Sequence, residues 1–164
     1  MIAEMEIVKQ LMETHSPIEK RAVTNHRTLN EAYDYKRPSS FSRGMRIDLN
    51  GLTILLISGT ASIDEHGEIV HVGDFRAQLK RTFHNISLLL EAEGATWHDI
   101  VRTSCYLRDI ERDYAAFNEE RTAFYKEQQL NPLPASTGIQ AILCFPELLI
   151  EIEAIAMFRT DKKK

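Results

Sequence analysis

The sequence lacks the features that mark several large classes of protein. It has 2 cysteines in 164 residues, Cys105 and Cys144, without metal-ligand spacing, so neither a disulfide framework nor a zinc site is predicted. Acidic residues outnumber basic ones by 24 to 20, and the net charge of −4 leaves no basic footprint for nucleic acid. No apolar run approaches the ~20 residues of a membrane-spanning helix, and the N-terminus lacks the apolar segment of a signal peptide. We therefore expect a cytoplasmic protein that binds neither nucleic acid nor membrane.

Motifs for metals and cofactors are missing as well. The 6 histidines show no His-x-x-x-His or His-Glu-x-x-His spacing, and no glycine-rich phosphate loop is present. Cys105 has no activating neighbour in the sequence, which argues against catalysis by a thiolate. No metal and no cofactor are therefore predicted.

The apolar content suits one domain, since 43% of the residues are hydrophobic and 27% are charged. We divide the chain into an N-terminal helix and arm (1–40), a folded domain (41–158) and a basic tail (159–164). Within the first part, apolar residues at helical spacing predict a helix over residues 2–13. Residues 14–40 show little periodicity and are interpreted as an arm, which either packs on the domain or forms a lid over a neighbouring site.

Strand patterns open the folded domain. Residues 45–49 alternate between apolar and polar side chains, and Asn50-Gly51 then predicts a tight β-hairpin. The returning strand, 52–57, is apolar throughout, which is typical of a central strand covered on both faces. Residues 58–61, Ser-Gly-Thr-Ala, are interpreted as a turn of small residues that a ligand can approach closely.

Two helices and one strand are predicted next. Asp74 is the predicted N-cap of a helix that runs to residue 93, and Gln78 and Asn85 within it are expected to be exposed. A strand is predicted over residues 100–107 and a second helix over residues 114–128.

The C-terminal part, residues 132–158, is predicted to form a hairpin of two strands joined at Phe145-Pro146-Glu147. Alternation places Glu151 and Glu153 on one face of its second strand. A carboxylate on a buried sheet face needs a partner or a pocket, whereas a polar stripe that faces solvent needs neither. Both interpretations remain open from the periodicity.

The element order β-β-α-β-α-β-β predicts an α+β fold. We expect a two-layer sandwich in which both helices cover one face of a mixed sheet. The other sheet face would stay apolar and exposed in a monomer, which predicts self-association into a closed cyclic oligomer.

Short motifs run through residues 41–158 in a characteristic order. They are Phe41-Ser42-Arg43-Gly44, Ser58-Gly59-Thr60, Gly67, Gln78, Asn85-Ile86, Gly94, Val101, Asn118, Phe124, Pro134-Ala135 and Glu151-Ile152-Glu153-Ala154-Ile155-Ala156. Together they resemble the Rid/YjgF (RidA, reactive intermediate deaminase) family, formerly called endoribonuclease L-PSP. The resemblance implies a chorismate-mutase-like fold and a homotrimer whose sheets form a central barrel, with ligand clefts between subunits. It also implies hydrolysis of 2-imino or 2-enamino acids, such as 2-aminoacrylate, to 2-keto acids and ammonia.

The resemblance places the family's site residues one by one. The glutamate that positions the attacking water corresponds to Glu151. The arginine that holds the substrate carboxylate corresponds to Ser136, within the motif Pro-Ala-Ser-Thr-Gly of residues 134–138. A serine hydroxyl supplies neither the charge nor the two parallel hydrogen bonds of a guanidinium. This departure argues against the usual deaminase activity unless another cation replaces the missing arginine.

The predicted site consists of the catalytic Glu151 and the substrate-binding residues Phe41, Ser58, Gly59, Arg102, Ser136, Thr137 and Gly138. Arg43, Arg46 and Arg102 are the candidates for a replacement cation. Arg102 is favoured because its strand is expected to run beside the C-terminal hairpin. Tyr33 or Tyr35 of the arm could supply an aromatic wall.

Three hypotheses about function remain. The first is an enzyme that hydrolyses an imine, an enamine or a related small substrate bearing a carboxylate. The second is a non-catalytic trimer that binds a small metabolite or a partner in the same cleft, which the serine at position 136 favours. The third, a chorismatase-like activity, rests on a short similarity over residues 134–139.

Overall fold

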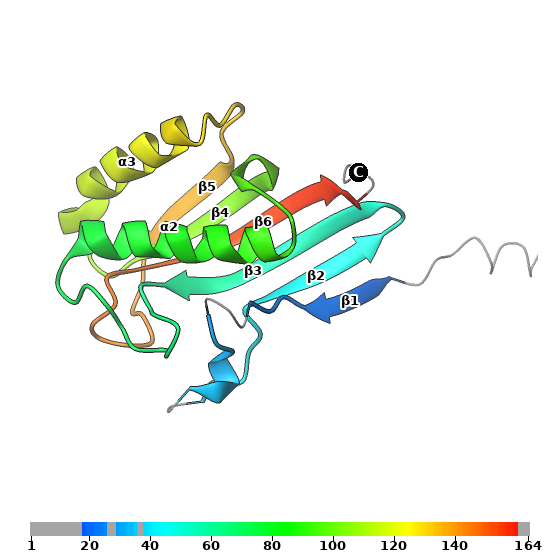
Figure 1. The fold of residues 1–164 in the computed structure, drawn as a ribbon. Helices are drawn as coiled ribbons and strands as arrows, with labels where there is room; N and C mark the ends of the chain where they lie inside the picture. Colours follow the sequence, from blue (N-terminus) through cyan, green and yellow to red (C-terminus); the bar gives the residue numbers. More distant parts are fainter. Residues whose placement is uncertain (1–17, 26–28, 36–37, 161–164) are drawn as a thin grey trace, which may run out of the picture.

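The computed structural model describes residues 18–25, 29–35 and 38–160, so the helix predicted over residues 2–13 and most of the basic tail lie outside it. The described residues form one sheet in the order β1-β2-β3-β6-β4-β5 (Figure 1). Its strands are β1 (Glu19–Ala22), β2 (Gly44–Leu49), β3 (Leu52–Ala61), β4 (Ile100–Leu107), β5 (Ala135–Gln140) and β6 (Ile150–Arg159). The helices are α2 (Phe75–Ala92), α3 (Ile110–Glu127) and the short 3-10 helices η1 (Ala32–Asp34) and η2 (Trp97–Asp99).

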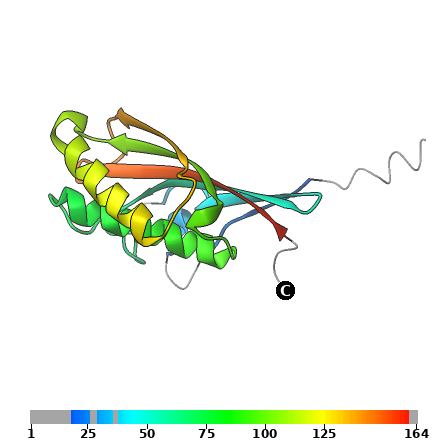
Figure 2. The same ribbon diagram turned by 90° about the horizontal axis from the view of Figure 1, so that it is seen from above.

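Both long helices cover the same face of the sheet, as Figure 2 shows from above. The predicted cap of the first helix is confirmed, because the Asp74 side chain accepts a hydrogen bond from the Ala77 N–H at 3.0 Å. The second helix begins at Ile110, four residues before its predicted start at Tyr114, because Asp109 caps it through the Arg112 N–H. The predicted two-layer α+β sandwich is confirmed, with antiparallel pairs and one parallel pair in the sheet.

The core fills the space between this sheet face and the helices. Leu55 of β3 and Ile152 of β6 are fully buried there against Ile86 of α2. Aromatic rings also pack between the two helices, where Phe83 of α2 stacks on Phe124 of α3 with ring centroids 4.5 Å apart. Such contacts hold the sheet rigid beneath any site built on its other face.

Two polar residues of α2 do not face solvent, and the prediction that they are exposed is wrong. Gln78 and Asn85 are both 0% exposed. The Gln78 amide donates to the Glu147 carbonyl at 2.9 Å and accepts from the Leu149 N–H at 2.9 Å. Asn85 donates to the carbonyls of Ala61 and Ile63. Both amides satisfy backbone groups outside the helix, which a helical periodicity cannot reveal.

The predicted C-terminal hairpin is also wrong. The two strands exist, but β5 pairs in parallel with β4, and β6 pairs antiparallel with β3 and β4. Strand β4 therefore lies between them. Alternation along a segment identifies a strand but does not identify its neighbours, and here α3 carries the chain back so that β5 can run parallel to β4.

Strand β3 corrects two further predictions. It continues through Ala61, so residues 58–61 form no turn; the pairing with β6 instead shifts register between Ile57 and Thr60, as in a β-bulge. The strand is also not covered on both faces in the chain itself. Leu55 is 0% exposed on the helix side, whereas the neighbouring Leu56 is 40% exposed on the other side.

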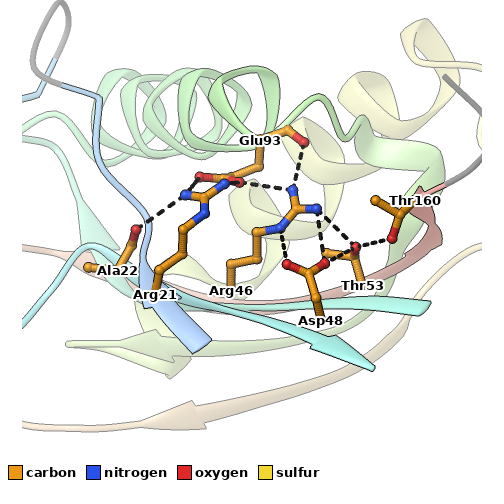
Figure 3. Close-up of polar contacts among 7 residues, drawn as sticks. All are labelled: Arg21, Ala22, Arg46, Asp48, Thr53, Glu93 and Thr160. Carbon is orange, nitrogen blue, oxygen red and sulfur yellow. Dashed lines mark hydrogen bonds and ion pairs between the residues drawn. The ribbon is translucent and has the colours of Figure 1, made fainter. Parts of the chain in front are cut away.

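The arm contributes a strand that the sequence pattern did not indicate. Strand β1 lies at the sheet edge, antiparallel to β2. Figure 3 shows how it is held: the Arg21 guanidinium donates two hydrogen bonds, of 2.8 and 2.6 Å, to the buried carboxylate of Glu93. Arg46 of β2 donates to the same carboxylate at 3.1 Å and to Asp48 at 2.7 Å. This cluster ties the arm to the end of α2.

Candidate functional site

A cavity of about 630 Å³ opens at the end of the sheet where β3 finishes and β6 begins. Its walls come from the arm, from the loop after β3 and from the loop between β5 and β6, which meet at the same end of the molecule (Figure 1). Most of its lining is apolar or aromatic. The ionisable side chains in the lining are Tyr35, Arg43, His66, Glu68, Cys144, Glu147 and Glu151.

Glu151 lies in this cavity against a glycine. Its neighbours in β6, Ile150 and Ile152, pack under the helices, so alternation turns Glu151 toward the opposite face. The irregularity in β3 brings Gly59 beneath it, and a Cβ at Gly59 would overlap the Glu151 carboxylate. Glycine at position 59 therefore provides the space that the carboxylate occupies.

The surroundings of Glu151 favour its protonated form. Burial raises the pKa of the carboxyl, and the negative charge of Glu153 raises it further. No described residue donates a hydrogen bond to the Glu151 carboxylate. By contrast, Glu153 accepts a hydrogen bond from the Tyr106 hydroxyl at 2.9 Å. The two carboxylates share a sheet face, as predicted, but Glu151 is the one in the cavity.

Arg43 lines the same cavity and is only 4% exposed. Its Nε and Nη2 atoms donate to the Asn30 carbonyl at 3.1 and 2.9 Å, and Nη2 also donates to the Tyr35 hydroxyl. Burial lowers the pKa of this guanidinium, against the influence of Tyr35 and Glu31. No carboxylate of the described chain forms an ion pair with it, which is unusual for a buried arginine.

The arm forms one wall of the cavity through Tyr35. Its ring packs on the backbone at Gly67, where φ is +81° and a Cβ would overlap the ring. Phe41, another predicted site residue, lies in the lining, and its ring is 5.6 Å from the Arg43 guanidinium. Tyr33, the alternative aromatic residue, is 54% exposed and outside the lining. Beyond its packing as β1, the arm therefore borders the cavity.

Ser58 does not line the cavity but supports one of its walls. The Ser58 hydroxyl donates to the Ser42 carbonyl at 2.8 Å, and the Ser58 N–H donates to the Arg43 carbonyl. These two bonds hold the segment that presents Phe41 and Arg43.

The remaining predicted site residues lie away from the cavity lining, on β4 and β5. Arg102 donates to the Thr137 hydroxyl at 3.0 Å on these strands. Ser136 points the other way, toward α3. Its hydroxyl accepts hydrogen bonds of 3.1 Å from the Thr103 hydroxyl of β4 and from Arg121 of α3. A guanidinium thus lies beside the position of the family arginine, although it comes from α3. Nothing in the sequence pattern singled out Arg121.

Two other candidate groups have structural roles. Arg46, a predicted replacement cation, is committed to Glu93 and Asp48. Cys105 is 1% exposed, and burial raises the pKa of its thiol, which disfavours a thiolate. Within residues 18–25, 29–35 and 38–160, no three potential metal ligands cluster. No helix of these residues is both long and apolar enough to span a membrane.

Comparison with known proteins identifies the family. The chain matches the endoribonuclease L-PSP family over residues 36–158 and belongs to this family. The family resemblance based on the sequence motifs is thus confirmed.

Its relatives include a RutC family protein of Pyrococcus abyssi, 37% identical over 103 residues, which are 62% of this chain and 76% of the relative. The 3-aminoacrylate deaminase RutC of Acinetobacter baylyi is 33% identical over 103 residues, 63% of this chain and 78% of the relative. The crystal structure of the YjgF gene product of E. coli superimposes with a TM-score of 0.67 and 26% identity, covering 85% of this chain and 99% of that one.

Proposed function

We propose that this protein hydrolyses a small imine or enamine that bears a carboxylate, with Glu151 positioning and activating the attacking water. The observation that carries this proposal is the Glu151 carboxylate itself, which faces a cavity, rests on Gly59 and receives no hydrogen bond from the described residues. Its lone pairs are open to a water molecule. Its raised pKa makes it a better proton acceptor than an ordinary glutamate.

The reaction needs one water and one base. The water oxygen attacks the carbon of the protonated imine, C=NH2+, while Glu151 takes a water proton, which leaves a neutral carbinolamine. Glu151 then returns the proton to the nitrogen, the C–N bond breaks to release ammonia, and the hydroxyl passes its proton to Glu151 as the C=O bond forms. Ammonia takes this proton from Glu151 and leaves as ammonium. An enamine reaches the same protonated imine by taking a proton from solvent on its β-carbon. The products are a 2-keto acid and an ammonium ion.

The naming of one relative as a 3-aminoacrylate deaminase supports this class of reaction. That relative is 33% identical to the chain over 103 residues. We take the reaction class from this similarity and the role of Glu151 from the geometry of the cavity.

We further propose that the protein is a homotrimer. Leu56, Ile139 and Met157, from three different strands, are 40%, 44% and 39% exposed on the sheet face that the helices leave open. Exposed apolar residues spread across a sheet favour burial by association, and cyclic closure buries them without leaving a free edge. A neighbouring subunit would then border the cavity. Sedimentation analysis should give a mass close to three times 18.8 kDa.

A non-catalytic metabolite-binding trimer is the second candidate. The serine at position 136 favours it, because the family's charged anchor is absent there. In this case a ligand would bind in the cavity without reacting.

The test is an imine-hydrolysis assay in which a pyridoxal-phosphate dehydratase generates 2-aminoacrylate and keto-acid release is followed. The wild-type protein should accelerate release, and Glu151→Gln should lower the rate by about 10²–10⁴-fold, as expected for loss of a general base. Glu153→Gln, a matched change outside the cavity lining, should retain most of the activity. Ser136→Arg tests the family position directly. Absence of acceleration by the wild type, with ligand binding retained, would favour the non-catalytic trimer.

A further inference from the structure

The cavity contains two ionisable groups, Arg43 and Glu151, that form no ion pair with the described residues. Arg43 forms no ion pair with a described carboxylate, and Glu151 accepts no hydrogen bond from the same part of the chain. The two do not pair with each other either, since no ion pair within 4.0 Å joins them. Burying a charge without a partner is costly, so an arrangement of this kind is expected where a ligand supplies the missing charge.

Arg43 has a donor available for such a ligand. Its described hydrogen bonds use Nε and Nη2, which leaves the Nη1 donors without a partner among the described residues. The bonds to the Asn30 carbonyl and to Tyr35 fix the orientation of the guanidinium without neutralising it. The carboxylate of Glu31 is near enough to influence Arg43, yet neither of its oxygens accepts a hydrogen bond.

We propose that Arg43 binds the substrate carboxylate in place of the missing arginine at position 136, and that the substrate is a monocarboxylate with an apolar or aromatic body larger than a three-carbon imine. The carboxylate would lie at the Arg43 end of the cavity, with the reacting carbon toward Glu151. Binding by Arg43 stands on its own geometry, whereas the reaction at the other end rests on the function proposed above for Glu151.

The size and lining of the cavity support the second part of the proposal. A volume of about 630 Å³ greatly exceeds what 2-aminoacrylate needs. Phe41, Tyr35 and Phe145 supply aromatic walls, and Ile69 and Leu148 are apolar. A three-carbon ligand would leave these surfaces wet, whereas a larger apolar body would bury them.

The other arginines do not satisfy the same conditions. Arg46 is neutralised by two carboxylates, and Arg102 lies outside the cavity lining. Arg121 stacks on Phe117 and donates to Asn118 and Ser136 on the helix side of the sheet. Arg121 lies beside Ser136, the position of the family arginine, so it is the alternative carboxylate-binding residue that the experiments must test.

The first experiment measures binding by calorimetry and requires no turnover. The probes are 3-phenylpropanoate, its carboxamide 3-phenylpropanamide, and propanoate. Wild-type protein should bind 3-phenylpropanoate at least 10-fold more tightly than either of the others, because charge-assisted hydrogen bonds are among the strongest in proteins. Arg43→Gln should abolish the preference for carboxylate over carboxamide, and Arg43→Lys should keep part of it. Arg76→Gln, the same change at an exposed arginine of α2, should leave the preference intact.

The second experiment follows turnover of imines made by an amino-acid oxidase from phenylalanine and from alanine. The phenylalanine-derived imine should show the higher kcat/KM, and Arg43→Gln should lower it about 10–100-fold, mainly through KM. If the wild type turns over neither imine but its carboxylate preference depends on Arg43, the hydrolase function fails and the carboxylate site stands. If the wild type shows no carboxylate preference, or loses it in Arg121→Gln and keeps it in Arg43→Gln, the proposal for Arg43 is overturned. Arg43→Lys and the wild-type comparison decide the matter even if Arg43→Gln does not fold.

Discussion

Two arginines that are close together in the sequence, the buried Arg43 and the half-buried Arg46, have different partners. Arg46 lies in a cluster where Asp48 and Glu93 accept its hydrogen bonds, and this pairing raises its pKa (Figure 3). Arg43, three positions earlier, has a carbonyl and a hydroxyl as its acceptors among the described residues, and burial lowers its pKa. A neutralised cluster is complete without a ligand and serves to hold the fold. An arginine left without a carboxylate is incomplete, and this difference directs attention to the cavity.

The largest expected effect comes from removing Glu93, the carboxylate that Arg21 and Arg46 share. Glu93→Ala should lower the free energy of unfolding by about 3 kcal/mol, because Arg46 loses a buried partner and β1 loses its anchor to α2. Denaturant unfolding measures the change. The matched control is Arg76→Ala, which removes exposed ion pairs with Glu119 and Glu120 and should lower the free energy of unfolding much less. Equal losses of unfolding free energy in the two variants would mean that the Glu93 cluster stabilises the fold no more than exposed ion pairs do.

A methyl group at Gly59 tests whether Glu151 occupies the assigned position in the cavity. Gly59→Ala should displace the Glu151 carboxylate and lower keto-acid release about 100-fold, since small misplacements of a catalytic group have effects of this size. Gly138→Ala is the matched change in a strand, where a Cβ would meet nothing within 4 Å, and it reports what the substitution alone does to the melting temperature. Full activity in Gly59→Ala would exclude the position assigned to Glu151.

The smallest expected effect is on pH dependence. The folded protein raises the pKa of Glu151, so it binds a proton more tightly than the unfolded chain does. Stability contributed by this group is present at low pH and falls as the pH rises through the folded pKa. The acid limb of the kcat/KM profile should accordingly lie above the ordinary glutamate pKa. Glu153→Gln should shift that limb to lower pH by less than the total displacement, because burial, the larger cause, remains. An unchanged limb would remove Glu153 as a cause.

The sequence predicted the helices and strands better than it predicted which strands pair and which residues contact one another. Asp74 and Asn50-Gly51 are local signals, because a cap and a two-residue turn depend on adjacent backbone groups, and both are found. The hairpin over residues 132–158 failed because pairing depends on where α3 returns the chain. The prediction for Gln78 and Asn85 failed because their partners are backbone groups of segments distant in the sequence.

The site divides in the same way. Periodicity placed Glu151 and Glu153 on one sheet face, and the family motif selected Glu151 between them. Arg102 was favoured as the replacement cation, yet Arg43 is the candidate that lines the cavity. No local pattern distinguishes these two arginines, since the difference between them is which one the fold brings to the cavity.

By itself, the sequence determined the family, the α+β class, the capped helix α2 and the shared face of the two glutamates, because these follow from motifs and from the periods of strands and helices. The tertiary structure alone decided that β4 separates β5 from β6 and that a register shift in β3 places Gly59 under Glu151. It also decided that no carboxylate of the described residues pairs with Arg43. These last features arise from contacts between segments distant in the chain. Packing brings such segments together, and local sequence does not encode their register or their charge balance.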